Sequence, residues 1–149
     1  MPTFLITTEH SRDRSTWTLT MLDDDRGFLF PGDESTRVID ELDTEDLTRI
    51  EKTRDSAFFG TDLLLRLGNL GVDTVLLAGV STHACIAQTA RDAFANNVRA
   101  QVITDATADD RPEHHASVLQ LLEDDRQVAM TTVEATTERW QGAEGADDP

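Results

Sequence analysis

An apolar run followed directly by a helical pattern constrains the fold of this chain more than any other feature. Residues 74–79 read TVLLAG, without polar alternation, which is typical of a parallel strand covered on both faces. From residue 61 onward, predicted strands and helices alternate along the chain. We therefore expect a three-layer α/β/α fold in which right-handed crossovers place helices on both faces of a mostly parallel sheet.

The same reasoning assigns elements over most of the chain. The predicted strands lie at residues 4–8, 48–52, 74–79, 100–104 and 127–131. The predicted helices cover residues 61–69, 82–96 and 112–124. Polar residues predict a long loop at 9–35 and a shorter one at 105–111. We assign residues 1–134 to one domain and residues 135–149 to an acidic, flexible tail that frays beyond Trp140.

The chain is strongly acidic, with 13 Lys and Arg residues against 29 Asp and Glu residues and a formal net charge of −16. Such a surface repels nucleic-acid phosphates and anionic lipids, so we exclude nucleic acid and membrane as partners. The composition resembles that of halophilic proteins, in which concentrated salt screens the charge. An ordinary acidic protein is the alternative.

Cysteine content and hydropathy exclude further classes of protein. A single cysteine excludes an internal disulfide and a zinc site with several cysteines. The sequence contains neither the roughly 18 to 20 apolar residues of a membrane span nor a signal-peptide pattern at its start. We therefore expect a cytoplasmic protein.

Cys85 follows the strand predicted at 74–79 and falls in the first turn of the next predicted helix, with Ser81 as the N-cap. The inner face of that helix is predicted to carry Ile86, Ala90, Ala93 and Phe94. Unpaired N–H groups and the helix dipole at this point favour a thiolate, and the same N–H groups can hold an oxyanion. A buried structural cysteine is the alternative.

Lys52 is the only lysine of the chain and ends the strand predicted at 48–52. Lysine offers a compact charge with a tunable pKa, whereas the guanidinium of arginine stays protonated. A chain that otherwise uses arginine alone therefore suggests a catalytic role for Lys52, with a surface lysine as the alternative.

Three segments carry a resemblance to a known family. They read KTRDSAFFGTDL from Lys52, LLAGVSTHACIAQTARDA from Leu76 and VITDATAD from Val102. In this order and spacing, they resemble the isochorismatase-like cysteine hydrolases, which include nicotinamidases and N-carbamoylsarcosine amidohydrolases. The similarity extends from about Phe4 to about Glu134.

The resemblance implies a Cys–Lys–Asp triad. Cys85 would attack a carbonyl carbon to form a thioester-like acyl-enzyme, and Lys52 would stabilise the thiolate and the anionic intermediate. The backbone N–H groups of Ser81 and Cys85 would form the oxyanion hole. The resemblance also implies a cis peptide bond between Val80 and Ser81.

The sequence departs from the family pattern at its start. The resemblance assigns the general-base aspartate to a first strand, whereas this sequence begins at what looks like the second strand. We therefore expect a misplaced start, a fragment or a degenerate copy that lacks the first strand, its helix and the aspartate. Glu9 is the nearest substitute by topology, although we favour a solvated loop carboxylate. Asp105 is a weaker substitute and could instead cap the next turn.

Aromatic side chains and one histidine are candidates for a pocket. His10, Phe58 and Trp17 could line it, with core packing as the alternative for Phe58 and Phe59. Trp17 could instead contact a partner subunit, since the family commonly forms oligomers.

The histidines do not predict a metal site. His10 lies where nicotinamidases carry metal ligands, but no second histidine is near it, and a zinc or iron site needs about three protein ligands. His83 and Cys85 do not share a helix face, so we expect a packed or surface histidine. His114 and His115 are expected to be solvated. We predict no metal and no cofactor.

Together these features predict a cysteine hydrolase that cleaves a small amide or related C–N bond in a small-molecule substrate, as a homo-oligomer. The alternative is a catalytically silent member of the fold that acts as an oligomeric binding or scaffolding protein, because the aspartate is absent. A redox thiol is a weaker hypothesis because no second cysteine exists to resolve it. Isochorismate cleavage is disfavoured because those members tend to lack the cysteine.

Overall fold

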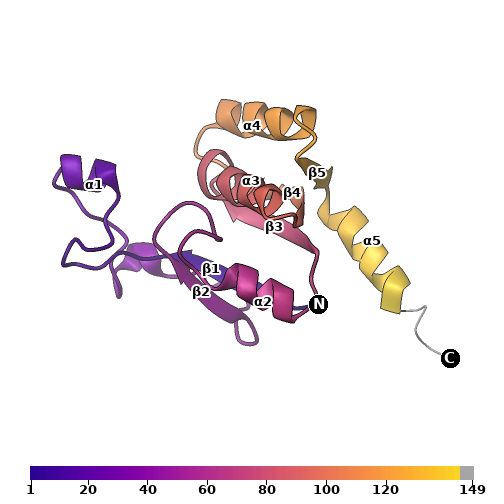
Figure 1. The fold of residues 1–149 in the computed structure, drawn as a ribbon, viewed down its shortest axis with the longest axis horizontal. Helices are drawn as coiled ribbons and strands as arrows, with labels where there is room; N and C mark the ends of the chain where they lie inside the picture. Colours follow the sequence, from indigo (N-terminus) through magenta and orange to yellow (C-terminus); the bar gives the residue numbers. More distant parts are fainter. Residues whose placement is uncertain (145–149) are drawn as a thin grey trace. The chain divides into compact units, whose positions relative to one another are not determined.

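The computed structural model describes residues 1–144 and divides into two compact units, which are described separately. The first unit is Met1–Arg66, and the second begins at Leu67. All strand pairs in both units are parallel, which confirms the predicted α/β class (Figure 1). In the described residues these strands form two sheets rather than the single sheet that we expected. No helix of the described residues is long and apolar enough to cross a membrane.

The first unit is built on strands β1 (Phe4–Thr8) and β2 (Thr48–Lys52), whose bounds match the prediction. They pair from Phe4 with Thr48 to Thr8 with Lys52, so both strands end at the same level. The side chain of Ile50 is buried at the centre of β2. The carboxyl ends of both strands therefore bring Thr8 and Lys52 side by side.

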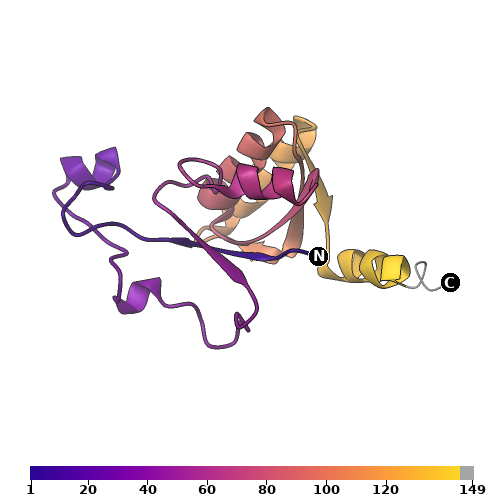
Figure 2. The same ribbon diagram turned by 60° about the horizontal axis from the view of Figure 1, so that its bottom comes forward.

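The segment between these strands is not the continuous loop that we predicted for 9–35. It contains a short helix, α1 (Leu19–Asp23), and a 3-10 turn, η1 (Glu34–Thr36), which can be followed in Figure 2. The hydroxyl of Thr18 accepts a hydrogen bond from the N–H of Met21, and the Met21 side chain is buried. A five-residue helix fixed by one cap and one anchor is too short for hydrophobic periodicity to reveal.

Helix α2 (Leu63–Asn69) begins two residues later than predicted. The hydroxyl of Thr61 accepts a hydrogen bond from the N–H of Leu63 and so caps the first turn. Beyond the last turn, Gly71 adopts a φ of 65°, as is common where glycine ends a helix.

The second unit contains strands β3 (Thr74–Val80), β4 (Arg99–Ala108) and β5 (Val128–Thr131), in the order β3–β4–β5. Strand β4 runs through residues 105–108, which we predicted as loop. After a shift in register, Gly79 pairs with Thr107 and Val80 pairs with Ala108. These added pairs keep a polar segment in strand conformation, and polar composition alone gave no sign of them.

Three helical segments accompany this sheet. The segment predicted as one helix at 82–96 is a π-helix, η2 (Thr82–Ile86), followed by α3 (Ala87–Ala95). Helix α4 (Pro112–Asp124) has the predicted bounds, with Pro at its start. Figure 1 draws α3 and α4 side by side, and both helices contact β4.

The core of the second unit is made of small and branched side chains. Ala90, Ala93, Val102 and Leu122 have no exposed surface. The prediction for Phe94 is wrong, because 53% of this residue is exposed. The alanines let α3 approach the sheet closely, and the larger Phe94 ring, in the last turn, lies outside this narrow buried face.

The end of the chain also differs from the prediction. Helix α5 (Val133–Glu144) occupies most of the segment that we assigned to a flexible tail beginning at 135. The carboxylate of Asp105 accepts a hydrogen bond from the N–H of Val133 and caps this helix. Residues 145–149 of the predicted tail lie outside the described residues.

Candidate active site

Lys52 is buried at the carboxyl end of β2, with 5% of its surface exposed. Its ammonium group donates hydrogen bonds to the Thr8 hydroxyl at 2.7 Å and to the Arg54 carbonyl at 2.9 Å. A surface lysine, the alternative considered above, is therefore wrong. The pairing of β1 with β2 places the Thr8 acceptor opposite Lys52, so sheet formation itself orients the ammonium.

Arg54, two residues after Lys52, holds the segment that follows β1. Its guanidinium donates to the carbonyl oxygens of Thr16 at 2.8 Å and Trp17 at 3.2 Å. Sequence reasoning did not single out Arg54. Its position in the KTRD segment was the available signal, but its acceptors are backbone carbonyls that no side-chain pattern identifies.

Glu9 follows β1 directly and is buried. Its carboxylate forms an ion pair with Arg49, and its N–H donates to the Lys52 carbonyl at 3.1 Å. Our expectation of a solvated loop carboxylate is therefore wrong. Because a cation already pairs with this carboxylate, Glu9 is poorly suited to act as a base.

The candidate pocket residues of the first unit are packed and hydrogen-bonded. His10 is buried, and its Nδ1 lies 2.9 Å from the Thr16 carbonyl, so this nitrogen carries a proton and donates. The indole of Trp17 donates to the Ser11 carbonyl at 3.0 Å. Phe58 is half-buried, and its neighbour Phe59 is exposed. A role for His10, Trp17 and Phe58 in lining a pocket stays a prediction.

Cys85 is half-buried within η2, the π-helix that follows β3. The peptide bond between Val80 and Ser81 is cis, where the resemblance places it. The Ser81 carbonyl accepts hydrogen bonds from the N–H groups of Ala84 and Ile86, each at 3.2 Å. The chain therefore turns at Ser81 and places the thiol in the first helical turn beyond the carboxyl end of the strand.

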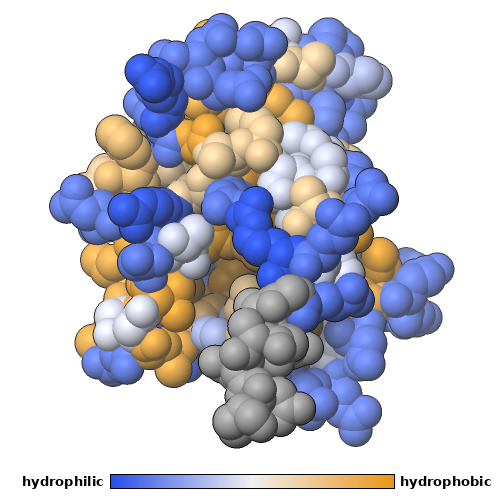
Figure 3. All heavy atoms as spheres, turned by 90° about the vertical axis from the view of Figure 1, so that its right-hand side faces the viewer, coloured by the Kyte–Doolittle hydropathy of each residue, from blue (hydrophilic) through white to orange (hydrophobic). Residues whose placement is uncertain are grey.

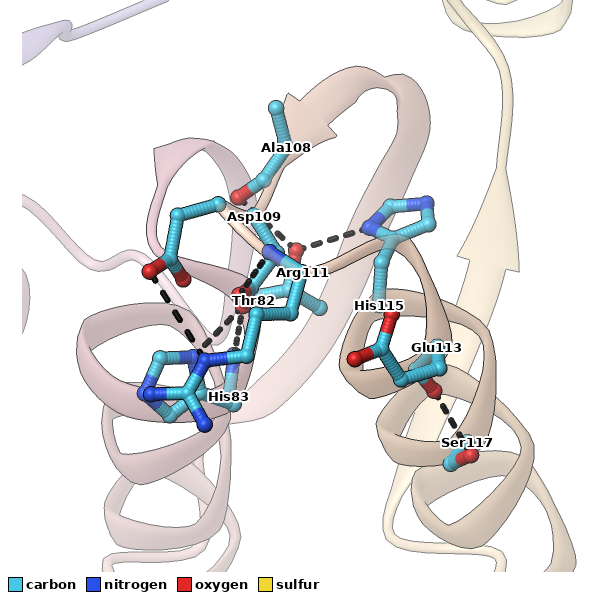
Figure 4. A network of polar contacts seen from close by, with 9 residues as sticks. Thr82, His83, Ala108, Asp109, Arg111, Glu113, His115 and Ser117 are labelled. Atoms are coloured by element: carbon cyan, nitrogen blue, oxygen red, sulfur yellow. Dashed lines mark hydrogen bonds and ion pairs between the residues drawn. The ribbon is translucent and has the colours of Figure 1, made fainter.

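Thr82 anchors this turn to the end of β4 and to α4 (Figure 4). Its side chain is fully buried, and its hydroxyl contacts the Ala108 carbonyl at 3.0 Å and Nδ1 of His115 at 2.8 Å. A hydroxyl has one proton, which it donates to the carbonyl, so the ring N–H of His115 donates to the hydroxyl oxygen. Our expectation that His115 is solvated is wrong, because this histidine is half-buried and bonded.

His83 is exposed, as expected, and is held by Asp109 (Figure 4). Both its N–H and its Nδ1 contact Oδ2 of Asp109, at 2.8 Å and 2.7 Å. Burial alone would raise the pKa of Asp109, but hydrogen bonds from the His83 N–H, the His83 ring and the Arg111 N–H lower this pKa well below its usual range. The sequence analysis missed Asp109 because it follows β4, in the segment taken for a loop.

The predicted site residues thus fall into two groups. Lys52, Glu9 and His10 lie in the first unit, around the ends of β1 and β2. Ser81 and Cys85 lie in the second unit, beyond the end of β3. Asp105 does not cap the next turn, as we considered, but accepts a hydrogen bond from the N–H of Val133 at the start of α5.

Comparisons with known proteins agree with the sequence resemblance. Residues 1–135 match the family described as the isochorismatase domain. A probable inactive nicotinamidase from Arabidopsis thaliana is 42% identical over 99 residues, which are 64% of this chain and 50% of that protein. The chain thus matches half the length of that relative.

Solved structures show the same fold. An isochorismatase-like hydrolase from Alkaliphilus metalliredigens is 31% identical, with a TM-score of 0.78 over 91% of this chain and 71% of its own. The N-carbamoylsarcosine amidase from Thermoplasma acidophilum is 26% identical, with a TM-score of 0.70 over 89% of this chain and 72% of its own. The resemblance stated from the sequence is therefore confirmed.

Proposed function

Because this chain belongs to the isochorismatase domain family, we propose that it hydrolyses a small amide or a related C–N bond through an acyl-enzyme on Cys85. The observation that carries this proposal is the placement of Cys85 in a turn that Thr82 and His83 fix from two sides. The Cys85 thiolate would attack the carbonyl carbon and expel the amine, which leaves with a proton. Water would then cleave the thioester to release the acid and the thiol.

The backbone around Cys85 is compatible with the proposed oxyanion hole. The N–H of His83 donates to Asp109, and the N–H of Ala84 donates to the Ser81 carbonyl, so neither is suited to the oxyanion. The N–H groups of Ser81 and Cys85 are the proposed donors, as the resemblance implies. Donors that are fixed before the reaction stabilise an oxyanion without reorganisation.

Lys52 is proposed to stabilise the thiolate and the anionic intermediate. Its burial and its two short hydrogen bonds hold the ammonium in one position, as an electrostatic role requires. We do not propose Glu9 as the base because it pairs with Arg49. The resemblance assigns the base to an aspartate in a strand ahead of Phe4.

A second candidate is a catalytically silent member of the fold with a binding or scaffolding role. The plant relative described as a probable inactive nicotinamidase supports this candidate. Both candidates share the fold and the Cys85 turn, and they differ in the reactivity of the thiol.

Alkylation of Cys85 separates the two. Because the chain has one cysteine, iodoacetamide labelling followed by intact-mass measurement reports on Cys85 alone. We expect Cys85 to be alkylated faster at neutral pH than free cysteine in solution, and Lys52→Met to slow this alkylation. We also expect ammonia release from at least one compound in a panel of small primary amides, and none from Cys85→Ala. An alkylation rate equal to that of free cysteine in both proteins, together with no hydrolysis, would support the silent candidate instead.

We also propose that the protein is a homo-oligomer in the cytoplasm. Hydrophilic side chains cover much of the face drawn in Figure 3, but hydrophobic ones interrupt them. Phe59, Phe94 and Leu65 are each more than half exposed. Exposed apolar surface of this kind marks contact sites when it is contiguous. Light scattering during size-exclusion chromatography, at low and at high salt, measures the assembly and its dependence on salt.

A further inference from the structure

Three potential metal ligands from separate segments meet in the second unit. They are His83 in η2, Asp109 after β4 and His114 in the first turn of α4. One ligand atom from each lies within 4.8 Å of the other two. The rings of His83 and His114 meet edge to face, with centroids 5.4 Å apart. This cluster is separate from His10, where the sequence analysis had looked for a metal.

We propose that His83, Asp109 and His114 bind a divalent transition-metal ion of the zinc class. Two imidazoles and one carboxylate suit zinc, cobalt or nickel, whereas calcium and magnesium prefer sites made of oxygen ligands. Three protein ligands leave a fourth position for water in a tetrahedral site. The inference does not depend on the hydrolase activity proposed above.

Asp109 is already oriented as a ligand. Its side chain has no exposed surface, and the N–H groups of His83 and Arg111 donate to its two oxygens at 2.8 Å and 3.2 Å (Figure 4). Metal-binding carboxylates are commonly held by such outer hydrogen bonds, which fix the geometry of the site. Asp109 would therefore be the fixed ligand toward which the two histidines move.

The histidines need only small movements to complete the site. Ligands at about 2.0–2.2 Å from a tetrahedral zinc ion lie about 3.3 Å apart. The Nδ1 of His83 is 2.7 Å from Asp109, and the remaining separations do not exceed 4.8 Å. His83 is exposed and His114 half-buried, so rotation of their side chains is not blocked by tight packing.

A hydrogen bond alone is the simpler explanation of the contact between His83 and Asp109. The role of His114 distinguishes this hydrogen bond from a metal site. Among the described residues, the His114 ring lies edge to face against the ring of His83, a contact that needs no metal. With a metal, His114 is a ligand as important as the other two. The substitution His114→Gln removes this ligand and keeps the hydrogen bond between His83 and Asp109.

The test is a zinc titration of the full chain after treatment with EDTA and removal of the chelator, followed by isothermal calorimetry. We expect one zinc ion per chain, and a loss of affinity of at least about tenfold in both His114→Gln and Asp109→Asn. Glu113→Gln is the matched control, because it removes one negative charge beside His114 without removing a ligand. Circular dichroism of each variant verifies that it folds, and the milder His114→Gln decides the test if Asp109→Asn unfolds.

Cobalt substitution identifies the ligands independently. We expect visible bands typical of a low-coordinate Co²⁺ ion and no thiolate-to-cobalt charge-transfer band. Absence of binding, or binding that is equally strong in His114→Gln, would overturn the proposal. A charge-transfer band that disappears in Cys85→Ser would also overturn it, because it would place the ion on the cysteine.

Discussion

The two units hold their candidate catalytic residues in different ways. In the first unit, Lys52 and Arg54 donate hydrogen bonds to backbone carbonyls, and a long connection is packed around aromatic rings. In the second unit, the turn that carries Cys85 is tied by side-chain contacts to the end of β4 and the start of α4. The long connection of the first unit therefore depends on how its aromatic rings pack. The Cys85 turn of the second unit depends on hydrogen bonds to polar side chains.

This difference predicts opposite sensitivities. The stability of the first unit should fall most when a side chain in the connection between β1 and β2 is enlarged, because this connection has little regular structure to absorb a shift. The stability of the second unit should fall most when a buried polar group is removed, because each hydrogen-bond partner ties the Cys85 turn to a different element. Four variants test this, in order of decreasing expected effect.

Gly27→Ala is expected to have the largest effect on stability, because a Cβ at this position would lie 2.3 Å from the Trp17 ring and 2.4 Å from the Phe30 ring. Trp17 cannot easily move, since its indole donates to the Ser11 carbonyl. We expect a loss of about 3 kcal/mol in the free energy of unfolding, measured in urea by tryptophan fluorescence.

Gly68→Ala is the matched control for this prediction. Gly68 lies in α2, where an added Cβ meets nothing within 4 Å, so alanine should stabilise the helix by about 0.5–1 kcal/mol. Equal effects of the two substitutions would contradict the idea that the connection is packed around Trp17.

Thr82→Val is expected to be next in size and to affect the second unit. Valine keeps the shape of the side chain but leaves the Ala108 carbonyl and the His115 ring without their buried partner. We expect a loss of about 2 kcal/mol in the free energy of unfolding and slower alkylation of Cys85.

Thr137→Val is the control for Thr82→Val. The Thr137 hydroxyl donates to the Val133 carbonyl within α5 and is exposed, so water can replace it. A double-mutant cycle that combines Thr82→Val with His115→Gln should give a coupling energy above about 0.5 kcal/mol. A coupling energy of zero would show that Thr82 and His115 do not act together.

The sequence analysis succeeded mainly where local patterns mark an element and failed where distant residues hold it. Strands β1 and β2 and helix α4 were predicted to the residue, and local signals such as the apolar start of β1 and the N-terminal Pro of α4 mark two of them. The end of β4 was missed because pairs such as Val80 with Ala108 form after a register shift, which no local pattern records. The contact between Asp109 and His83 was missed for the same reason, since 26 residues separate the two. Elements that a local pattern marks are thus easier to predict than the distant residues that hold them in place.

Thr8→Val tests the first unit through its polar contact and is expected to have a smaller effect. Valine removes one of the acceptors of the Lys52 ammonium but leaves the Arg54 carbonyl in place. We expect a loss of about 1.5 kcal/mol in the free energy of unfolding, as for a hydrogen bond to a charged group.

Thr7→Val is the control, since successive side chains of a strand point to opposite faces. The Thr7 hydroxyl accepts a hydrogen bond from Nε of Arg49, and this hydrogen bond is exposed to solvent. Its loss should therefore lower the free energy of unfolding by less than about 0.5 kcal/mol. If Thr7→Val were as damaging as Thr8→Val, the loss would come from the strand rather than from Lys52.

The smallest expected effect is the pH dependence of stability that arises from Asp109. Hydrogen bonds from His83 and Arg111 outweigh burial and lower the pKa of Asp109 in the folded state. The ionised carboxylate therefore stabilises the fold fully above an unfolded-state pKa of about 3.9, and this contribution is lost as the pH falls through the lower folded-state pKa. In the presence of EDTA, Asp109→Asn should make the free energy of unfolding fall less steeply with decreasing pH below about pH 4.

Asp62→Asn is the informative comparison for this pH dependence. The pKa of Asp62 is also lowered, by a hydrogen bond from Arg66, but that exposed pair lies four residues apart in the first unit. Such local pairs contribute little because solvent screens them and both side chains lose freedom. We expect Asp62→Asn to change this pH dependence less than Asp109→Asn does. The reverse order would mean that a local ion pair outweighs the long-range contact between His83 and Asp109, and that the polar network is not what holds the Cys85 turn.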